Sequence, residues 1–213
     1  MNTNKIKNFK KGLKLAEEQR EILIGLILGD GHLETQNRGR TYRLKIEQSI
    51  QHEKYVNWLY KNFKEWVLTP PRRKINYDKR FSKSTVSLYF NTISHASFRF
   101  YAQQFYKNRK KVVPKQICRW LTPLSLAVWF MDDGSVKSNR HRSKIINTQS
   151  FTKKEVGLLS VCLEKKFGIK SNLRRQKGKD WQIYLLSETV GKFYQLVKTY
   201  ILPCMRYRLI KLD

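Results

Sequence analysis

Two Asp-Gly pairs are the residues best suited to chemistry in this sequence. Asp30-Gly31 and Asp133-Gly134 lie 103 positions apart, and each ends an apolar segment with helical spacing. A lone pair of this kind is an ordinary helix end, although an aspartate there is unfavourable because the helix dipole is already negative. If the two helices lie side by side, their carboxylates repel unless a cation lies between them. Carboxylates with phosphate oxygens bind Mg²⁺, which supports attack of water on a phosphodiester.

The elements that would position these acids occur twice in the same order. We expect helix, two strands, helix, two strands, helix, first over 16–30, 32–35, 42–49, 51–66, 72–77, 85–91 and 96–106. The series restarts over 124–133, 135–138, 144–148, a helix capped by Thr152 and Glu155, 170–176, 181–186 and 189–200. Gln48-Ser49 and Gln149-Ser150 recur at 101 positions, each at the end of a predicted strand. The halves therefore predict a pseudo-twofold molecule.

The predicted fold class is α+β, with duplicated α-β-β-α-β-β-α halves and two antiparallel sheets. We expect a basic N-terminal tail over 1–16, a first half over 17–111, a short linker over 112–121 and a second half over 122–213. Gly25 and Gly29, four positions apart on the first helix, permit close approach of a second helix.

The charge indicates a polyanionic partner. The 213 residues carry 44 Lys and Arg against 16 Asp and Glu, a formal net charge of +28. Such self-repulsion works against a compact state unless a polyanion offsets it, and nucleic acid is the obvious candidate. An anionic membrane is disfavoured because the basic residues are spread over the whole chain, and the longest apolar run, 22–28, is too short to span a bilayer. We also expect no signal peptide at the basic N-terminus.

The cysteines and histidines predict no further site. Cys118, Cys162 and Cys204 are odd in number and widely spaced, so we expect neither a disulfide framework nor a metal knuckle, which fits a reducing compartment. The four histidines show no spacing typical of metal ligands.

The two helical segments carry a resemblance. Residues 23–31 (LIGLILGDG) and 126–134 (LAVWFMDDG) resemble the two signature helices of the LAGLIDADG homing endonucleases, in their single-chain form. Flanking stretches such as 66–71, 121–127 and 147–151 extend the resemblance over nearly the whole chain from about residue 20. It implies cleavage of both strands of duplex DNA at long, rare sites with divalent metal.

The resemblance also implies roles for individual residues. Asp30 and Asp133 would bind the metals, and Gln48 and Gln149 would order water, although both glutamines could be ordinary strand ends. The family's basic pocket residue corresponds to Lys111, in a run that could also be a solvated basic surface, and to Arg208. Because Arg is permanently charged, Arg208 can stabilise phosphate but cannot readily act as a base.

Two positions depart from the family pattern. Asp132 stands where a small residue is usual, and we exclude it from the metal pair as a bystander at the helix end. Val128 likewise replaces a small residue, so we expect the second helix to pack less tightly against the first.

The strands predict the DNA-facing surface. Strands can enter the major groove, so one face of each would pack on helices and the other would carry basic residues to DNA. Some of these residues would contact phosphates and others guanine edges. The candidates are Arg38, Arg40, Arg43, Lys45, Arg72, Lys74, Lys79, Arg80, Lys137, Arg140, Arg142, Lys144, Arg174, Arg175, Lys177 and Lys179.

The sequence thus predicts a monomeric, site-specific DNA endonuclease that grips a long asymmetric site in a saddle of two sheets. Mg²⁺ is the expected cofactor, and Mn²⁺ or Ca²⁺ could occupy the same sites. We expect an intracellular protein, encoded by an organelle, a bacterium or a phage. The alternatives are an RNA-binding maturase that assists splicing of its intron, which needs the basic surface but not the acids, and a nuclease-dead DNA-binding regulator, which the two intact acids disfavour.

Overall fold

The chain folds into two compact units that do not follow the sequence halves. The computed structural model describes residues 8–79, 82–138, 141–176, 178 and 180–209, without the side chains of 137, 138, 141 and 142. The first unit comprises the chain up to Arg20 together with Gly31–Ala102, and the second comprises Glu21–Asp30 and Gln103–Asp213. Helix α2 (Glu17–Leu28) therefore begins in the first unit and ends in the second.

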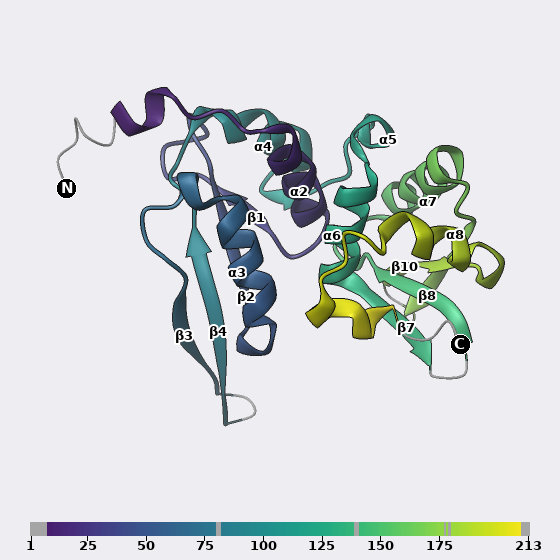
Figure 1. Ribbon diagram of the computed structural model, residues 1–213. Helices are drawn as coiled ribbons and strands as arrows, with labels where there is room; N and C mark the ends of the chain where they lie inside the picture. The colour runs from purple at the N-terminus through teal and green to yellow at the C-terminus, as the bar shows by residue number, and fades with distance from the viewer. Residues whose placement is uncertain (1–7, 80–81, 139–140, 177, 179, 210–213) are drawn as a thin grey trace. The chain divides into compact units, whose positions relative to one another are not determined.

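The first unit is built on a four-stranded antiparallel sheet of order β1-β2-β4-β3 (Figure 1). Leu44 and Ile46 are buried on one face, where α3 contacts β2 and β4, because successive residues of a strand point to opposite faces. The strands are β1 (His32–Glu34), β2 (Arg43–Ser49), β3 (Arg72–Asp78) and β4 (Lys83–Asn91). The helices after α2 are α3 (Glu53–Asn62) and α4 (Arg99–Phe105), with 3-10 turns at Ile50–His52, Lys64–Trp66 and Ala96–Phe98.

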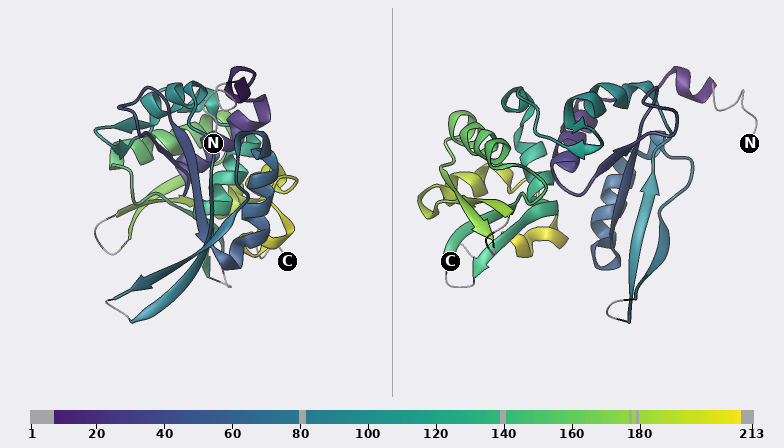
Figure 2. Two further views of the ribbon diagram at one scale, coloured as in Figure 1. Left: turned by 90° about the vertical axis from the view of Figure 1, so that its left-hand side faces the viewer. Right: turned by 180° about the vertical axis from the view of Figure 1, so that it is seen from behind.

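The second unit repeats this sheet with the order β7-β8-β10-β9, again antiparallel. Helix α7 covers β9 and β10 while α8 covers β8, which leaves the opposite face of the sheet open (Figure 2). The strands are β7 (Gly134–Ser138), β8 (His141–Asn147), β9 (Ser171–Gln176) and β10 (Asp180–Leu185). The main helices are α6 (Pro123–Asp133), α7 (Lys153–Phe167) and α8 (Ser187–Val197).

The structure confirms the duplicated α+β fold and its two antiparallel sheets. The box at the start of α7 is as predicted, since Thr152 accepts from the Glu155 N–H while Glu155 accepts from the Thr152 N–H. The second unit also has elements that the sequence did not predict. They are the hairpin of β5 (Tyr106–Lys107) and β6 (Lys110–Lys111), the short helix α5 (Ile117–Trp120) and a 3-10 segment at Pro203–Arg208.

The expectation that the chain has no disulfide is wrong. Cys118 in α5 and Cys162 in α7 are joined, with their Cα atoms 5.1 Å apart, while Cys204 is a free thiol. A separation of 44 residues does not reveal that α5 packs against α7, and this packing brings the two side chains together. The inference of a reducing compartment therefore loses its support from the cysteines.

Among the described residues, no helix is long and apolar enough to cross a membrane.

Candidate functional site

Helix α6 delivers Asp133 from the interior of the second unit. Thr122 and Ser125 form a capping box at its start, and Pro123 occupies the first turn, where its missing N–H costs nothing. Residues 124–132 are all buried, so the helix is enclosed around its whole circumference. Asp133 is its last residue, and Gly134 leads directly into β7.

Helix α2 delivers Asp30 in a comparable way. Residues 22–28 are buried, and the chain then turns through Gly29 to the exposed Asp30. An added Cβ at Gly25 would lie 2.7 Å from the Val128 Cβ, and one at Gly29 would lie 2.6 Å from the Asp132 Cβ. Both distances are far shorter than carbon atoms allow, so α2 and α6 meet at backbone contact. The expectation that Val128 loosens this packing is wrong, because Gly25 makes room for its side chain.

A basic side chain lies beside each acid. The Lys111 Nζ at the end of β6 donates to the carbonyl oxygen of Gly29 at 2.5 Å. The Arg208 Nη1 in the last 3-10 segment donates to the carbonyl oxygen of Gly134 at 2.6 Å. These carbonyls adjoin Asp30 and Asp133, so the two basic residues that the sequence singled out are both held next to the acids.

The electrostatics of this cluster reflect crowded charges. Burial, reinforced by the negative charge of Asp30, raises the pKa of the Asp133 carboxyl to about 7, although Lys111 and Arg208 act in the opposite direction. Burial also lowers the pKa of Lys111, against the charges of Asp132, Asp133 and Asp30. The negative charge of Asp133 is thus unfavourable in this place, and a nearby cation would stabilise it.

The donor set fits divalent ions that are completed by other oxygens. Asp30 and Asp133 could supply hard oxygen ligands, and a cation between them would offset the repulsion of their charges. Among the described residues, no group of three or more His, Cys, Asp or Glu side chains could hold a metal by itself. Water and phosphate oxygens would therefore complete the coordination, as is usual for Mg²⁺.

The two predicted glutamines lie in different units. Gln48 is near the end of β2 in the first unit, where its Oε1 lies 3.4 Å from the His52 Nδ1. Gln149 follows β8 in the second unit, is exposed, and donates to the Gln176 Oε1 at 3.0 Å.

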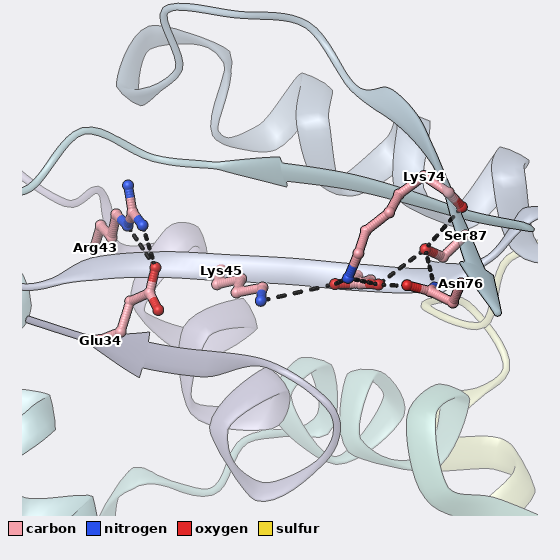
Figure 3. Close-up of polar contacts among 7 residues, drawn as sticks. Glu34, Arg43, Lys45, Lys74, Asn76 and Ser87 are labelled. Atoms are coloured by element: carbon pink, nitrogen blue, oxygen red, sulfur yellow. Dashed lines mark hydrogen bonds and ion pairs between the residues drawn. The ribbon is translucent and has the colours of Figure 1, made fainter. Parts of the chain in front are cut away.

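The open face of the first sheet holds cations clamped by carboxylates (Figure 3). The Arg43 Nε donates to the Glu34 Oε1 at 2.6 Å, between the paired strands β2 and β1. Glu47 accepts from the Lys74 Nζ at 3.1 Å and lies 3.7 Å from the Lys45 Nζ. Four predicted DNA-facing residues, Arg43, Lys45, Arg72 and Lys74, are on this face by register.

Glu47 is held by neutral groups as well. The Ser87 hydroxyl donates to its Oε1 at 2.9 Å, and the Asn76 side chain does so at 3.3 Å. Burial acts in the opposite direction, but hydrogen bonds from Ser87, Lys74 and Asn76 hold the pKa of Glu47 below its usual value. The carboxylate therefore stays charged and fixes its neighbours.

The open face of the second sheet holds a chain of neutral amides instead. The Gln182 Nε2 donates to the Asn147 Oδ1 at 2.5 Å and to the Gln176 Oε1 at 3.1 Å. The Asn147 Nδ2 in turn donates to the carbonyl oxygen of Asp133 at 2.8 Å. Gln149 joins the far end through Gln176, so one continuous chain runs from a predicted water-ordering residue to the backbone of a predicted metal ligand.

Two predicted DNA-facing residues are on the wrong face of this sheet. Lys144 is 1 % exposed and pairs with Leu185 in β10, so it points into the interior with Ile146. Arg175 lies over Trp181, on the face that α7 covers, whereas its neighbour Arg174 lies on the open face over Tyr184. Alternation along a strand explains both corrections, since adjacent residues cannot share a face.

The remaining predicted DNA-facing residues are in or near loops. Arg38 and Arg40 are exposed between β1 and β2, and Lys79 is exposed after β3. Arg80, Arg140, Lys177 and Lys179 lie outside the described residues, as do the side chains of Lys137 and Arg142.

Sequence reasoning missed the residues that hold the site. Glu34 and Glu47 lie on the same strand faces as the predicted cations, and this alternation is the sequence signal that indicates them. Asn147, Gln176 and Gln182 carry no motif, and their hydrogen bonds depend on the strand register.

Comparison with known proteins identifies the family. Residues 20–193 match the LAGLIDADG DNA endonuclease family, and the chain belongs to it. A solved structure of the homing endonuclease I-WcaI bound to its DNA recognition sequence matches with a TM-score of 0.93 and 30% identity, covering 100% of this chain and 95% of that one.

Curated relatives point the same way. The "Probable intron-encoded endonuclease 1" of Wickerhamomyces canadensis is 32% identical over 98% of this chain and 91% of its own length. The "Cytochrome b mRNA maturase bI2" of Debaryomyces hansenii is 30% identical over 95% of this chain and 76% of its own.

Proposed function

We propose that this endonuclease hydrolyses both strands of duplex DNA at a long, specific site, with divalent metal ions held by Asp30 and Asp133. The observation that carries the proposal is the meeting of α2 and α6 at backbone contact, which places the two acids at the ends of packed helices. The raised pKa of Asp133, caused by burial and by the charge of Asp30, supports a cation as the missing partner. Mg²⁺ is the ion we propose.

The metal, when bound, would activate water and stabilise the leaving oxygen of a phosphodiester. The chain's own residues do the rest. The carboxylates of Asp30 and Asp133 would provide the oxygen ligands. Lys111 and Arg208 place positive charge beside these acids, where a phosphate would develop negative charge. Burial lowers the pKa of Lys111, which suits that residue to carry a proton.

The open faces of the two sheets are the proposed DNA-binding surfaces. Arg43, Lys45, Arg72 and Lys74 supply the first face, and Arg174 supplies cationic charge to the second. Clamped cations suit base recognition, because a side chain with a fixed rotamer loses little entropy on binding. The two faces differ in chemistry, which suits an asymmetric target.

The test is cleavage of a plasmid library that contains random and intron-junction sites, with Mg²⁺, followed by sequencing of the ends. We expect a defined double-strand cut from the parent protein and none in EDTA. The variants Asp30→Asn and Asp133→Asn keep the side-chain shape but remove the charge, and we expect each to lose at least about a thousandfold in cleavage rate. Cutting at the parental rate by both variants would show that the assignment of these acids is wrong.

A second function has one specific observation behind it. A relative that covers 95% of this chain is named a maturase, and RNA binding needs the basic surface but not the acids. If the library yields no cut site, binding and splicing of the RNA of the host intron would be measured with the parent and with Asp30→Asn. Splicing that survives the substitution would favour the maturase function.

A further inference from the structure

Asp132 is a buried carboxylate for which the proposed reaction assigns no role. It precedes Asp133 in α6, and only 6 % of the residue is exposed. Its Oδ2 accepts a hydrogen bond from the backbone N–H of Asp30, at 3.0 Å, across 102 residues of sequence. A carboxylate that accepts a backbone N–H forms a strong, charge-assisted bond. Asp132 therefore reaches from one helix to the acid at the end of the other.

The same peptide group is held from its other side. The carbonyl of Gly29 and the N–H of Asp30 belong to one planar unit, and that carbonyl accepts from the Lys111 Nζ at 2.5 Å. Asp132 and Lys111 thus bind opposite ends of a single peptide group. Together they fix its plane, and with it the starting direction of the Asp30 side chain.

The space around this contact is built for it. An added Cβ at Gly29 would lie 2.5 Å from the Asp132 Oδ2 and 2.6 Å from its Cβ, so only glycine fits opposite Asp132. Gly29 precedes Asp30 just as Asp132 precedes Asp133, and the two motif positions are therefore filled by complementary residues, one without a side chain and one with a carboxylate.

The second acid is held differently. The carbonyl of Asp133 accepts from the Asn147 Nδ2 at 2.8 Å, and the following carbonyl of Gly134 accepts from Arg208. Both groups belong to the same half of the sequence as Asp133. The peptide before Asp30 is instead held by one group from its own half, Lys111, and by one from the other half, Asp132.

We propose that Asp132 is a positioning residue, which acts through the Gly29–Asp30 peptide to hold the Asp30 carboxylate in its working orientation. The inference rests on the proposed function and deepens it. Asp30 and Asp133 occupy equivalent places in a repeated motif, and the two strands of a duplex are related by a local twofold axis, so we assign one acid to each strand. Loss of Asp132 then impairs one strand more than the other.

Two substitutions of nearly equal shape test this. Asp132→Asn keeps an oxygen that can accept the Asp30 N–H, whereas Asp132→Leu fills the same volume without an acceptor. Single-turnover cleavage of the cut site found with the parent would be followed on each strand separately. For Asp132→Leu we expect one strand to be slowed about 10- to 100-fold more than the other, with nicked duplex accumulating, as is typical for loss of an outer hydrogen bond at a metal site. For Asp132→Asn we expect both strands within about fivefold of the parent.

Measurements that do not depend on cleavage separate positioning from other roles. Target binding in Ca²⁺ and the thermal midpoint are recorded for both variants, and binding is expected to change less than about threefold. Parental rates on both strands for Asp132→Leu overturn the proposal. Equal loss on both strands in both variants, with weakened Ca²⁺-dependent binding, makes Asp132 a metal ligand and also overturns it.

Two further outcomes are decisive. If Asp132→Leu does not fold, Asp132→Asn alone carries the test, and a loss as large as that of Asp30→Asn contradicts the proposal. If the parent itself cuts no site, the proposed function has failed rather than the role of Asp132.

Discussion

The two sheets have the same strand order, but the open face of the first carries ion pairs and the open face of the second carries neutral amides. In the first, Glu34 and Glu47 pair with cations, so charge is present but constrained (Figure 3). In the second, Asn147, Gln182 and Gln176 form a neutral chain that ends on the carbonyl of Asp133. The strand order is therefore repeated while the side chains of the open faces differ, and in the second unit the open face is linked by a hydrogen bond to the backbone of the proposed metal ligand Asp133.

The largest expected effect concerns Asp133, where the chain of hydrogen-bonded amides ends. In the unfolded chain Asp133 titrates at its ordinary value of 3.8, but in the folded protein its pKa is about 7 because of burial and the charge of Asp30. The folded state thus holds this proton more tightly, so the contribution of Asp133 to stability is fully present below pH 4 and is lost as the pH rises through 7. An asparagine at position 133 does not ionise, so the Asp133→Asn variant does not lose this stability as the pH rises.

We therefore expect metal-free Asp133→Asn to gain stability over the parent as the pH rises, by about 2–4 kcal/mol at pH 8. Urea unfolding in EDTA at pH 5, 6, 7 and 8 measures the difference, with Asp180→Asn at an exposed position as the control. A stability difference that does not change with pH would contradict the assigned cause.

The next effect concerns the centre of the amide chain. Gln182→Leu removes the side-chain donor to the part-buried Asn147 Oδ1, and it leaves the Gln176 Oε1 with Gln149 as its remaining donor. We expect a loss of about 1–3 kcal/mol in the free energy of unfolding. Gln176→Leu, at an exposed position in the same chain, serves as the control with an expected loss below about 1 kcal/mol. Equal losses in the two variants would show that Gln182 stabilises the chain of amides no more than Gln176 does.

A smaller effect is expected on the first sheet. Glu47→Gln removes the charge that holds Lys74 and Lys45, so both become available to phosphates. We expect non-specific duplex DNA to bind about three- to tenfold more tightly while discrimination between target and non-target DNA falls. Glu188→Gln makes the same change of charge at an exposed position on α8 and is the control. Improved discrimination in Glu47→Gln would show that the carboxylate does not organise recognition.

The smallest effect separates two basic residues of the second sheet. Arg174 is on the open face, whereas Lys144 is buried on the other. We expect Arg174→Ala to lower the slope of log affinity against log salt by about 1, and Lys144→Met to leave the slope unchanged. Titrations between 50 and 200 mM salt (about the range over which such slopes are resolved) measure both. Equal slopes in the two variants would contradict the register-based assignment.

Much of the fold could be predicted because its signals are local. The Asp-Gly ends, the paired glycines of α2 and the capping box of α7 each depend on neighbours within a few residues. The face of Lys144 could not be predicted in this way. It depends on the register with β10, beside an irregularity in the pairing of β7 with β8, and a shift of one residue would reverse it.

The site was predictable only in part, for a similar reason. Lys111 and Arg208 came from a resemblance, and the structure confirms only that they lie beside the acids. The contact of Asp132 could not be predicted, because its hydrogen bond to Asp30 spans 102 residues and no pattern in the chain records it. The disulfide of Cys118 and Cys162 was missed for the same lack of a local signal.

The division of α2 between the units constrains how such nucleases can be recombined. Its end, residues 21–30, is part of the second unit, although it precedes the first sheet in the chain. A chimera that exchanged sequence halves at the linker would therefore combine Gly25 and Gly29 from one parent with Val128 and Asp132 from another. Compatible parents are those in which each bulky residue of one signature helix still meets a glycine on the other.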